Sequence, residues 1–273
     1  MILKDKLIFY STKDFSKNNV KIKSGTTILL GPNVNIIFAN VKMLGSKNKP
    51  IIIKRLDKNK PFGAVVIKES DSSLLRYVNI SGGSGFKNKY YEYTGQFSAH
   101  DVDDLIIEMC KFSSNSDYDD NVHLVYVENF LIKNSVIENS PSDGIDIDIS
   151  KGKIENSVFL NNGNDGLDLM TSNVNVNKST FTNNGDKGIS VGENSNLNLN
   201  NSSLNENYIG IEVKDKSTAI LLPTVSLKSN FKYDINLKKK NYRFSGGGTI
   251  KIPLTLSNTN IKKDNFSKLV IYK

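Results

Sequence analysis

Residues 164–190 read NDGLDLMTSNVNVNKSTFTNNGDKGIS, and their first six letters return in altered form as DKGISV at residues 186–191. The same 22-residue interval separates four glycines along the chain, Gly144, Gly166, Gly188 and Gly210. Each glycine is followed by an apolar, a polar and an apolar residue, which is the alternation of a half-buried strand. The interval therefore predicts a stack of similar units about 22 residues long.

Two further short strands are indicated in each unit. One recurs around Ile132, Ile154 and Val176, and the other ends at Ile137, Phe159 and Phe181. A leucine-rich repeat has a similar period, but its signature and a helical apolar period are both absent from these units. We predict an all-β fold, a parallel β-helix with three short strands per coil.

Stacked coils lie about 4.8 Å apart, so equivalent residues of successive coils become neighbours. Asn134 and Asn156 are 22 residues apart and are expected to stack at a bend, because asparagine tolerates left-handed backbone geometry. Similar strand patterns extend over residues 20–83 and 217–261. They predict about ten to twelve coils over residues 20–270, an N-terminal cap at residues 1–19, and one domain over residues 1–273.

Composition narrows the classes of partner. The net charge of +8 comes mostly from lysine, whereas nucleic-acid readers rely on arginine, so we expect no nucleic-acid partner. An anionic polysaccharide or simple solubility accounts better for this charge. No apolar run approaches the roughly 20 residues of a membrane span, and the N-terminal residues lack the apolar core of a signal peptide. The single cysteine, Cys110, excludes an internal disulfide framework.

Several segments resemble a known family over nearly the whole chain. The segments are SGGSGF (81–86), FSAHDV (97–102), SDGIDIDIS (142–150), GNDGLDLMTS (163–172) and GDKGISVGENS (185–195). They resemble right-handed parallel β-helices of the pectin-lyase-like class. More narrowly, they are similar to a β-helix segment of bacterial secreted or surface proteins, sometimes linked to a kinase-like domain of the spore-coat protein H type. The resemblance implies right-handed winding and an extracellular or cell-surface location, and it implies no settled activity.

Candidate catalytic residues come from the outward position of the glycine strand. Counting back from Asp168 and Asp146 by one coil reaches His123, and a further 23 residues reaches His100. We predict that these four side chains form one outward column, with Asp148 two residues along on the same face. Ordinary surface polarity is the competing interpretation.

Neighbouring carboxylates repel, which raises one pKa unless a cation or a proton compensates. Two arrangements remain open. Asp146, Asp148 and Asp168 could hold a divalent cation such as calcium. Alternatively, a carboxyl and a histidine share proton transfer, with His123 as the base because its unperturbed pKa lies near neutrality. The second arrangement suits a polysaccharide lyase or epimerase.

A uronate substrate would also need cationic and stacking groups. Lysines on later coils could neutralise its carboxylate, namely Lys187, Lys214 and Lys216. Residues 84–97 interrupt the coil rhythm and carry Tyr90, Tyr91 and Tyr93, which could stack on sugar rings. A second insertion covers residues 113–121, so the two loops would flank a groove. We therefore predict that the protein binds or processes an acidic polysaccharide; the alternative is a non-catalytic adhesion or scaffold module, possibly part of a larger secreted protein. The sequence leaves the oligomeric state open.

Overall fold

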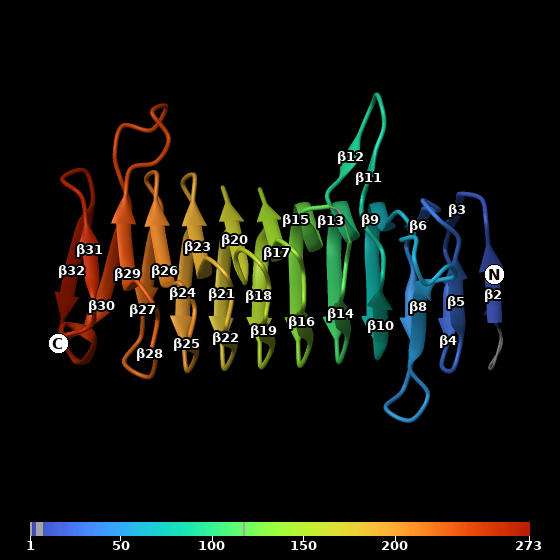
Figure 1. Ribbon diagram of the computed structural model, residues 1–273, viewed down its shortest axis with the longest axis horizontal. Helices are drawn as coiled ribbons and strands as arrows, with labels where there is room; N and C mark the ends of the chain where they lie inside the picture. The colour runs from blue at the N-terminus through green and yellow to red at the C-terminus, as the bar shows by residue number, and fades with distance from the viewer. Residues whose placement is uncertain (1, 4–7, 117) are drawn as a thin grey trace.

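The computed structural model describes residues 2–3, 8–116 and 118–273, which wind into a solenoid of successive β-coils (Figure 1). Nearly every strand pairs in parallel with the strand one coil further along, as β17 (Asp143–Asp148) does with β20 (Leu167–Met170). The exception is a short antiparallel hairpin of β11 (Phe86–Lys87) and β12 (Glu92–Tyr93). The predicted parallel β-helix is therefore confirmed.

The first face of the solenoid carries the glycine strands and, as shown below, the candidate site. In chain order it contains β3 (Phe15–Asn18), β6 (Ile36–Ala39), the first parts of β9 (Val65–Arg76), β13 (Gly95–Glu108) and β15 (Asp120–Lys133), then β17, β20, β23 (Lys187–Gly192), β26 (Ile209–Lys214), β29 (Tyr233–Lys238) and β31 (Ile261–Lys263). These eleven strand segments correspond to about eleven coils, within the predicted range.

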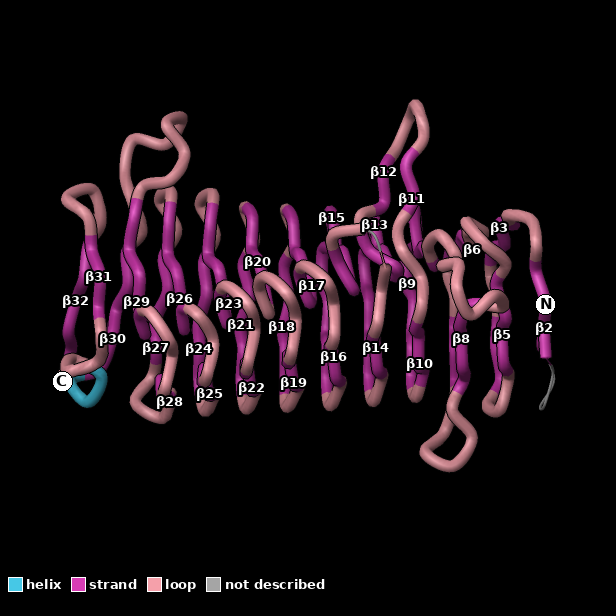
Figure 2. Tube along the Cα trace, in the orientation of Figure 1, coloured by secondary structure: helices cyan, strands magenta, loops and turns pink. Residues whose placement is uncertain are grey.

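The other two faces complete each coil (Figure 2). The second face contains β1 (Ile2–Leu3), β4 (Lys21–Lys23), β7 (Lys42–Leu44), the second parts of β9, β13 and β15, β18 (Lys151–Glu155), β21 (Asn173–Asn177), β24 (Asn196–Asn200), β27 (Thr218–Leu221), β30 (Thr249–Pro253) and β32 (Lys268–Tyr272). The third contains β2 (Ile8–Ser11), β5 (Thr27–Leu30), β8 (Ile51–Arg55), β10 (Val78–Ser81), β14 (Lys111–Ser113), β16 (Val136–Glu138), β19 (Val158–Leu160), β22 (Thr180–Thr182), β25 (Ser203–Asn205) and β28 (Ser226–Lys228).

The part of the chain predicted as an N-terminal cap, residues 1–19, contains β1, β2 and β3, and each pairs in parallel with a strand of the following coil. Residues 1 and 4–7 of that cap lie outside the described residues. The one helix in the described ranges is a three-residue 3-10 turn at Leu254–Leu256, so nothing there has the length and apolarity of a membrane-crossing helix.

The core is a set of aliphatic and aromatic columns inside the coils. Phe159 and Phe181 occupy equivalent positions of β19 and β22, and their rings stack with centroids 4.6 Å apart. Both side chains are fully buried. Burial of such columns supplies the main stabilisation of each coil against its neighbour.

Polar ladders hold the corners of the coils. Asn134 and Asn156 adopt left-handed backbone angles, and the Asn156 amide donates to Asn134 Oδ1 at 2.5 Å, as the bend prediction required. At a second corner the buried Ser157 Oγ accepts the backbone N–H of Ser135, one coil earlier. The serine ladder satisfies backbone groups that would otherwise be buried without partners.

The repeated glycine has a steric cause. A Cβ on Gly166 would lie 2.7 Å from the carbonyl oxygen of Gly188 and 2.9 Å from the side-chain amide of Asn184. Gly144 would meet the Gly166 carbonyl at the same distance. The four coils that carry Gly144, Gly166, Gly188 and Gly210 approach each other too closely here for a side chain, which is why glycine recurs in them.

Candidate acid–base site on the first face

A column of polar side chains runs along the outside of the first face. His123 pairs in register with Asp146, and Asp146 pairs with Asp168. The next positions in the column are Ser190, Glu212 and Asn236. The aspartates and His123 are thus brought together by coil stacking, because each occupies the same position of its strand.

His100 does not occupy the predicted position in this column. It pairs with Val125, and the partner of His123 is Ser98, so the predicted register was wrong by two residues. The coil between Ser98 and His123 contains 25 residues rather than 23, because the second insertion lengthens it. A shift of two residues keeps a side chain on the same face of a strand. The His100 and His123 rings therefore still meet, with centroids 5.2 Å apart.

His123 lies at the centre of a hydrogen-bonded chain. Its Nδ1 is 2.7 Å from Thr94 Oγ1, and the Thr94 hydroxyl donates to Asp120 Oδ2 at 2.5 Å. On the other side of the ring, Nε2 is 3.4 Å from Asp148 Oδ2. A hydroxyl has one proton, so when Thr94 donates to Asp120, His123 must donate through Nδ1. When Asp120 is protonated, both hydrogen bonds can reverse: Asp120 donates to the Thr94 hydroxyl, and Thr94 donates to His123 Nδ1.

Two carboxyl groups at this centre hold their protons unusually tightly. Burial raises the pKa of Asp120 well above its usual range, and the carboxylates of Asp143 and Asp119 raise it further against the hydrogen bond from Thr94. Burial also raises the pKa of Asp146, with added repulsion from Asp148 and Asp120. Desolvation and like charge act in the same direction, so both carboxyl groups beside the imidazole favour their protonated form more than an exposed aspartate does.

A second row of acidic residues lies at the start of the same strands. Burial raises the pKa of Asp143 to about 6 and that of Asp165 to about 7. Asp143 Oδ1 accepts the backbone N–H of Asp165 at 2.7 Å, and Asp165 Oδ1 accepts that of Lys187 at 3.0 Å. Neither aspartate was singled out in the sequence analysis. Their 22-residue recurrence was the available signal.

Sequence reasoning also missed Asp120 and Thr94. Asp120 is almost completely buried, and its Oδ1 has no hydrogen-bond partner among the described residues. One ligand atom each from Asp120, His123 and Asp146 lies within 4.8 Å of the others. An imidazole nitrogen with two carboxylates is a donor set typical of zinc and similar ions, whereas calcium prefers oxygen alone.

The predicted cation ligands are only partly grouped. Asp146 belongs to the cluster with Asp120 and His123, whereas Asp148 lies against His123 Nε2 and is not part of that cluster. Asp168 lies 3.8 Å from the Lys214 ammonium, which already supplies a positive charge at that position. The described geometry therefore assembles a different set from the one that the sequence suggested.

The two insertions meet beside the histidines. The hairpin of β11 and β12 projects from the solenoid (Figure 1), and the Tyr118 hydroxyl of the second insertion donates to Glu92 Oε1 at 2.9 Å. Tyr93 is buried, with its ring centroid 4.8 Å from that of His100. Tyr91 is partly exposed and Tyr90 is 82% exposed, so of the three predicted tyrosines these two present a surface to solvent.

The three predicted lysines occupy different environments. Lys214 is buried, donates to Ser190 Oγ at 2.8 Å and faces Asp168, so it shares the outer column. Lys187 is buried in ion pairs with Asp165 and Asp186. Lys216 is exposed on a turn with a left-handed backbone. Of the three, Lys214 is the one whose ammonium contacts members of the outer column, Ser190 and Asp168.

Known proteins share this architecture. A family model described as "Right handed beta helix region" matches residues 63–231, which is more than half of the chain. No curated protein matches the sequence.

Solved structures with a similar fold include tailspike protein 2 of Escherichia coli O157:H7 bacteriophage CAB120, with a TM-score of 0.62 and 11% identity over 92% of this chain and 38% of that one. The Dettilon tailspike protein has a TM-score of 0.51 and 13% identity over 97% and 61%. The A-module of a mannuronan C-5 epimerase from Azotobacter vinelandii has a TM-score of 0.47 and 12% identity over 97% and 88%. The chain spans less than two thirds of either tailspike protein. At these identities the likeness shows a shared fold, and with the family match it establishes that the chain belongs to the right-handed β-helix family.

Proposed function

We propose that this protein binds an acidic polysaccharide along the first face and processes it by proton transfer, as a lyase or an epimerase does. The observation that carries the proposal is the position of His123 between the Thr94–Asp120 pair and Asp148, next to Asp146. A base beside a carboxyl group whose pKa is raised by burial and like charge is the arrangement that general acid–base catalysis uses.

Each group has a role in that chemistry. Elimination and epimerisation both begin when a base removes the proton next to the uronate carboxylate, and His123 is the proposed base. In elimination, Asp146 would protonate the departing sugar oxygen; in epimerisation, it would return a proton to the opposite side of the carbon. The Lys214 ammonium, which lies 3.8 Å from Asp168 on the same face, would stabilise negative charge on the substrate carboxylate.

A non-catalytic carbohydrate-binding module is the second candidate. It is favoured by the low exposure of His123, which is 8% accessible to solvent. A buried base cannot reach a substrate proton unless the residues around it move, whereas binding at the rim needs no such movement.

One experiment separates the two candidates. The chain is incubated in deuterated water with a panel of uronate polymers; absorbance follows unsaturated products, and NMR follows deuterium incorporation at the reacting carbon. We expect turnover of at least one polymer and a loss of about 10²–10⁴-fold in His123→Ala. The control is Asp104→Asn, which removes an exposed carboxylate on the second face. Binding without deuterium incorporation or product would overturn the enzymatic proposal and leave the binding module.

A further inference from the structure

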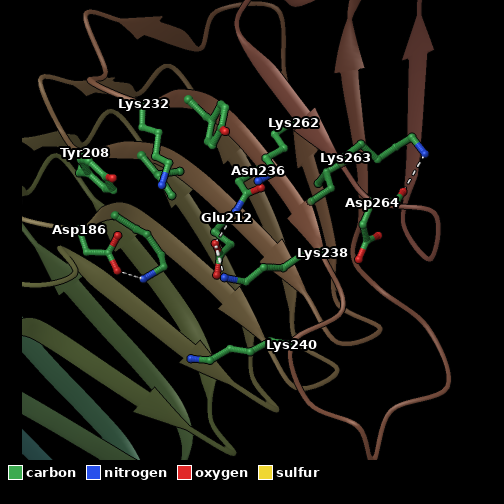
Figure 3. A pocket seen from close by; sticks show the side chains of 14 residues that line it. Asp186, Tyr208, Glu212, Lys232, Asn236, Lys238, Lys240, Lys262, Lys263 and Asp264 are labelled. Carbon is green, nitrogen blue, oxygen red and sulfur yellow. Dashed lines mark hydrogen bonds and ion pairs between the residues drawn. The ribbon is translucent and has the colours of Figure 1, made fainter.

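A second concave site lies further toward the C-terminus on the same face, over β26, β29 and β31 (Figure 3). The pocket has a volume of about 540 Å³, within the usual range for small-molecule and sugar sites. Glu212, in its floor, is four coil steps along the outer column from His123, or about 19 Å at the usual strand spacing. The pocket is therefore separate from the acid–base centre.

The pocket carries an excess of positive charge. Six lysines line it against three carboxylates: Lys187, Lys232, Lys238, Lys240, Lys262 and Lys263 against Asp186, Glu212 and Asp264. Within the described ranges, Lys232, Lys240 and Lys262 make no ion pair with a carboxylate. Uncompensated lysines converging on a concave surface attract an anionic ligand.

Aromatic rings border these lysines. Tyr208 and Phe231 are stacked with centroids 6.3 Å apart, and Phe231 is 88% exposed. The Lys232 ammonium lies 5.0 Å from the centre of the Tyr208 ring, and the Lys262 ammonium lies 5.3 Å from that of Tyr233. An exposed aromatic platform beside a cation suits a ring that has both an apolar face and a negative group.

Glu212 adds a requirement for a hydrogen-bond donor. It is completely buried; its Oε2 accepts a hydrogen bond from Asn236 at 2.6 Å and forms an ion pair with Lys238 at 2.9 Å. Its Oε1 has no partner in the part of the chain that the structure describes. A buried carboxylate oxygen without a donor is costly, so a ligand that brings a hydroxyl group to it would be favoured. A bare inorganic anion has no such group.

We propose that this pocket is a subsite for one carboxylated sugar unit. Its carboxylate would contact Lys232 and Lys262, its ring would lie on Tyr208 and Phe231, and a hydroxyl would donate to Glu212 after Lys238 swings aside. The proposal rests on the proposed function in taking the ligand to be part of the polymer processed at His123. A chain long enough to reach both sites would then be held at two points.

The test is calorimetric binding of defined oligosaccharides to the full chain. The probes are a uronate octamer, a uronate dimer, a neutral octamer and a sulfated octamer. We expect the uronate octamer to bind at least tenfold more weakly to the double variant Lys232→Gln/Lys262→Gln. The matched control is Lys21→Gln/Lys42→Gln, which removes the same charge from exposed positions of β4 and β7 and should bind as the unchanged protein does.

The outcomes distinguish the two proposals. Unchanged octamer affinity in the pocket variant, or equal weakening in both double variants, overturns the subsite even if His123-dependent turnover is found. A sulfated octamer that binds as tightly as the uronate and is unaffected by Glu212→Gln also overturns it, since the site would then read charge alone. Selective weakening in the pocket variant supports the subsite even if no polymer is turned over, in which case only the catalytic proposal fails.

Discussion

Thr94 Oγ1 lies 2.7 Å from His123 Nδ1 and donates a hydrogen bond to Asp120 Oδ2 at 2.5 Å, although 29 residues separate Thr94 from His123. Thr94 stands just after the β11–β12 hairpin, at the point where the chain returns to the first face. One hydroxyl thus sets the orientation of the imidazole and links it to a buried carboxyl group. The insertion that breaks the coil rhythm therefore also completes the candidate site.

Thr94→Val should weaken catalysis without removing a group that touches the substrate. Valine keeps the shape but breaks both hydrogen bonds, and bonds to charged groups contribute about 1.5–3 kcal/mol, equivalent to roughly 10–100-fold in rate. We expect kcat to fall by that factor and the pH–rate profile to shift, because the proton on Nδ1 is no longer held. Thr94→Ser should restore both, and a serine variant as impaired as the valine variant would contradict this role.

Asp146→Asn should abolish proton donation while preserving the fold. Asparagine mimics the shape of the neutral carboxyl but has no transferable proton, so turnover should fall by about 10²–10⁴-fold. The free energy of unfolding should be unchanged or higher at pH 8, because repulsion among Asp146, Asp148 and Asp120 is relieved. Initial rates and urea denaturation measure the two effects. Full activity in this variant would remove Asp146 from the mechanism.

His100 should make the protein sensitive to acid. Burial beside Tyr93, with repulsion from His123, lowers the pKa of His100 to about 3, whereas in the unfolded chain it titrates near 6.5. Between these values the unfolded chain holds a proton that the folded protein excludes. Stability therefore falls as pH drops below 6.5, by up to about 1.4 kcal/mol per unit from this residue.

The measurement is the free energy of unfolding of the unchanged protein and of His100→Gln from pH 8 to pH 4. Raised carboxyl pKa values of Asp143 and Asp165 act in the opposite direction, but they are present in both proteins and cancel in the difference. We expect the variant to become steadily more stable relative to the unchanged protein as the pH falls below 6.5. A constant gap would show that His100 titrates normally in the folded state.

Gly166→Ala should destabilise the solenoid by about 1–3 kcal/mol, the usual cost of forcing extra atoms into a packed site. The new Cβ would meet the Gly188 carbonyl at 2.7 Å, and backbone cannot move aside as a flexible side chain can. Gly246→Ala is the matched control, because the nearest atoms to its Cβ lie 3.9–4.0 Å away. Denaturant midpoints compare the two, and equal stability would contradict the steric explanation of the repeat.

The repeat made the architecture predictable. Each strand pairs in register with the equivalent strand of the next coil. The 22-residue intervals from Asp146 to Asp168 and from Asp168 to Ser190 therefore place these residues side by side. The register of His100 was predicted wrongly because an insertion lengthened one coil. Counting residues does not show which of them belong to the strand and which to the insertion. Asp120 was missed for the same reason, since it stands at the junction of that insertion and β15.

The sequence by itself determined that this protein is a β-solenoid, that its aliphatic residues fill the interior, and that His123, Asp146 and Asp168 share its outer surface. These follow from a period of two along each strand and a period of 22 along the chain. Only the tertiary structure decided that the two insertions meet, that Thr94 bonds His123, and that burial raises the pKa of Asp120 and Asp146. The physical reason is that a pKa depends on what covers a side chain and on the charges around it, and Thr94, Asp119 and Asp120 come from insertions that carry no period.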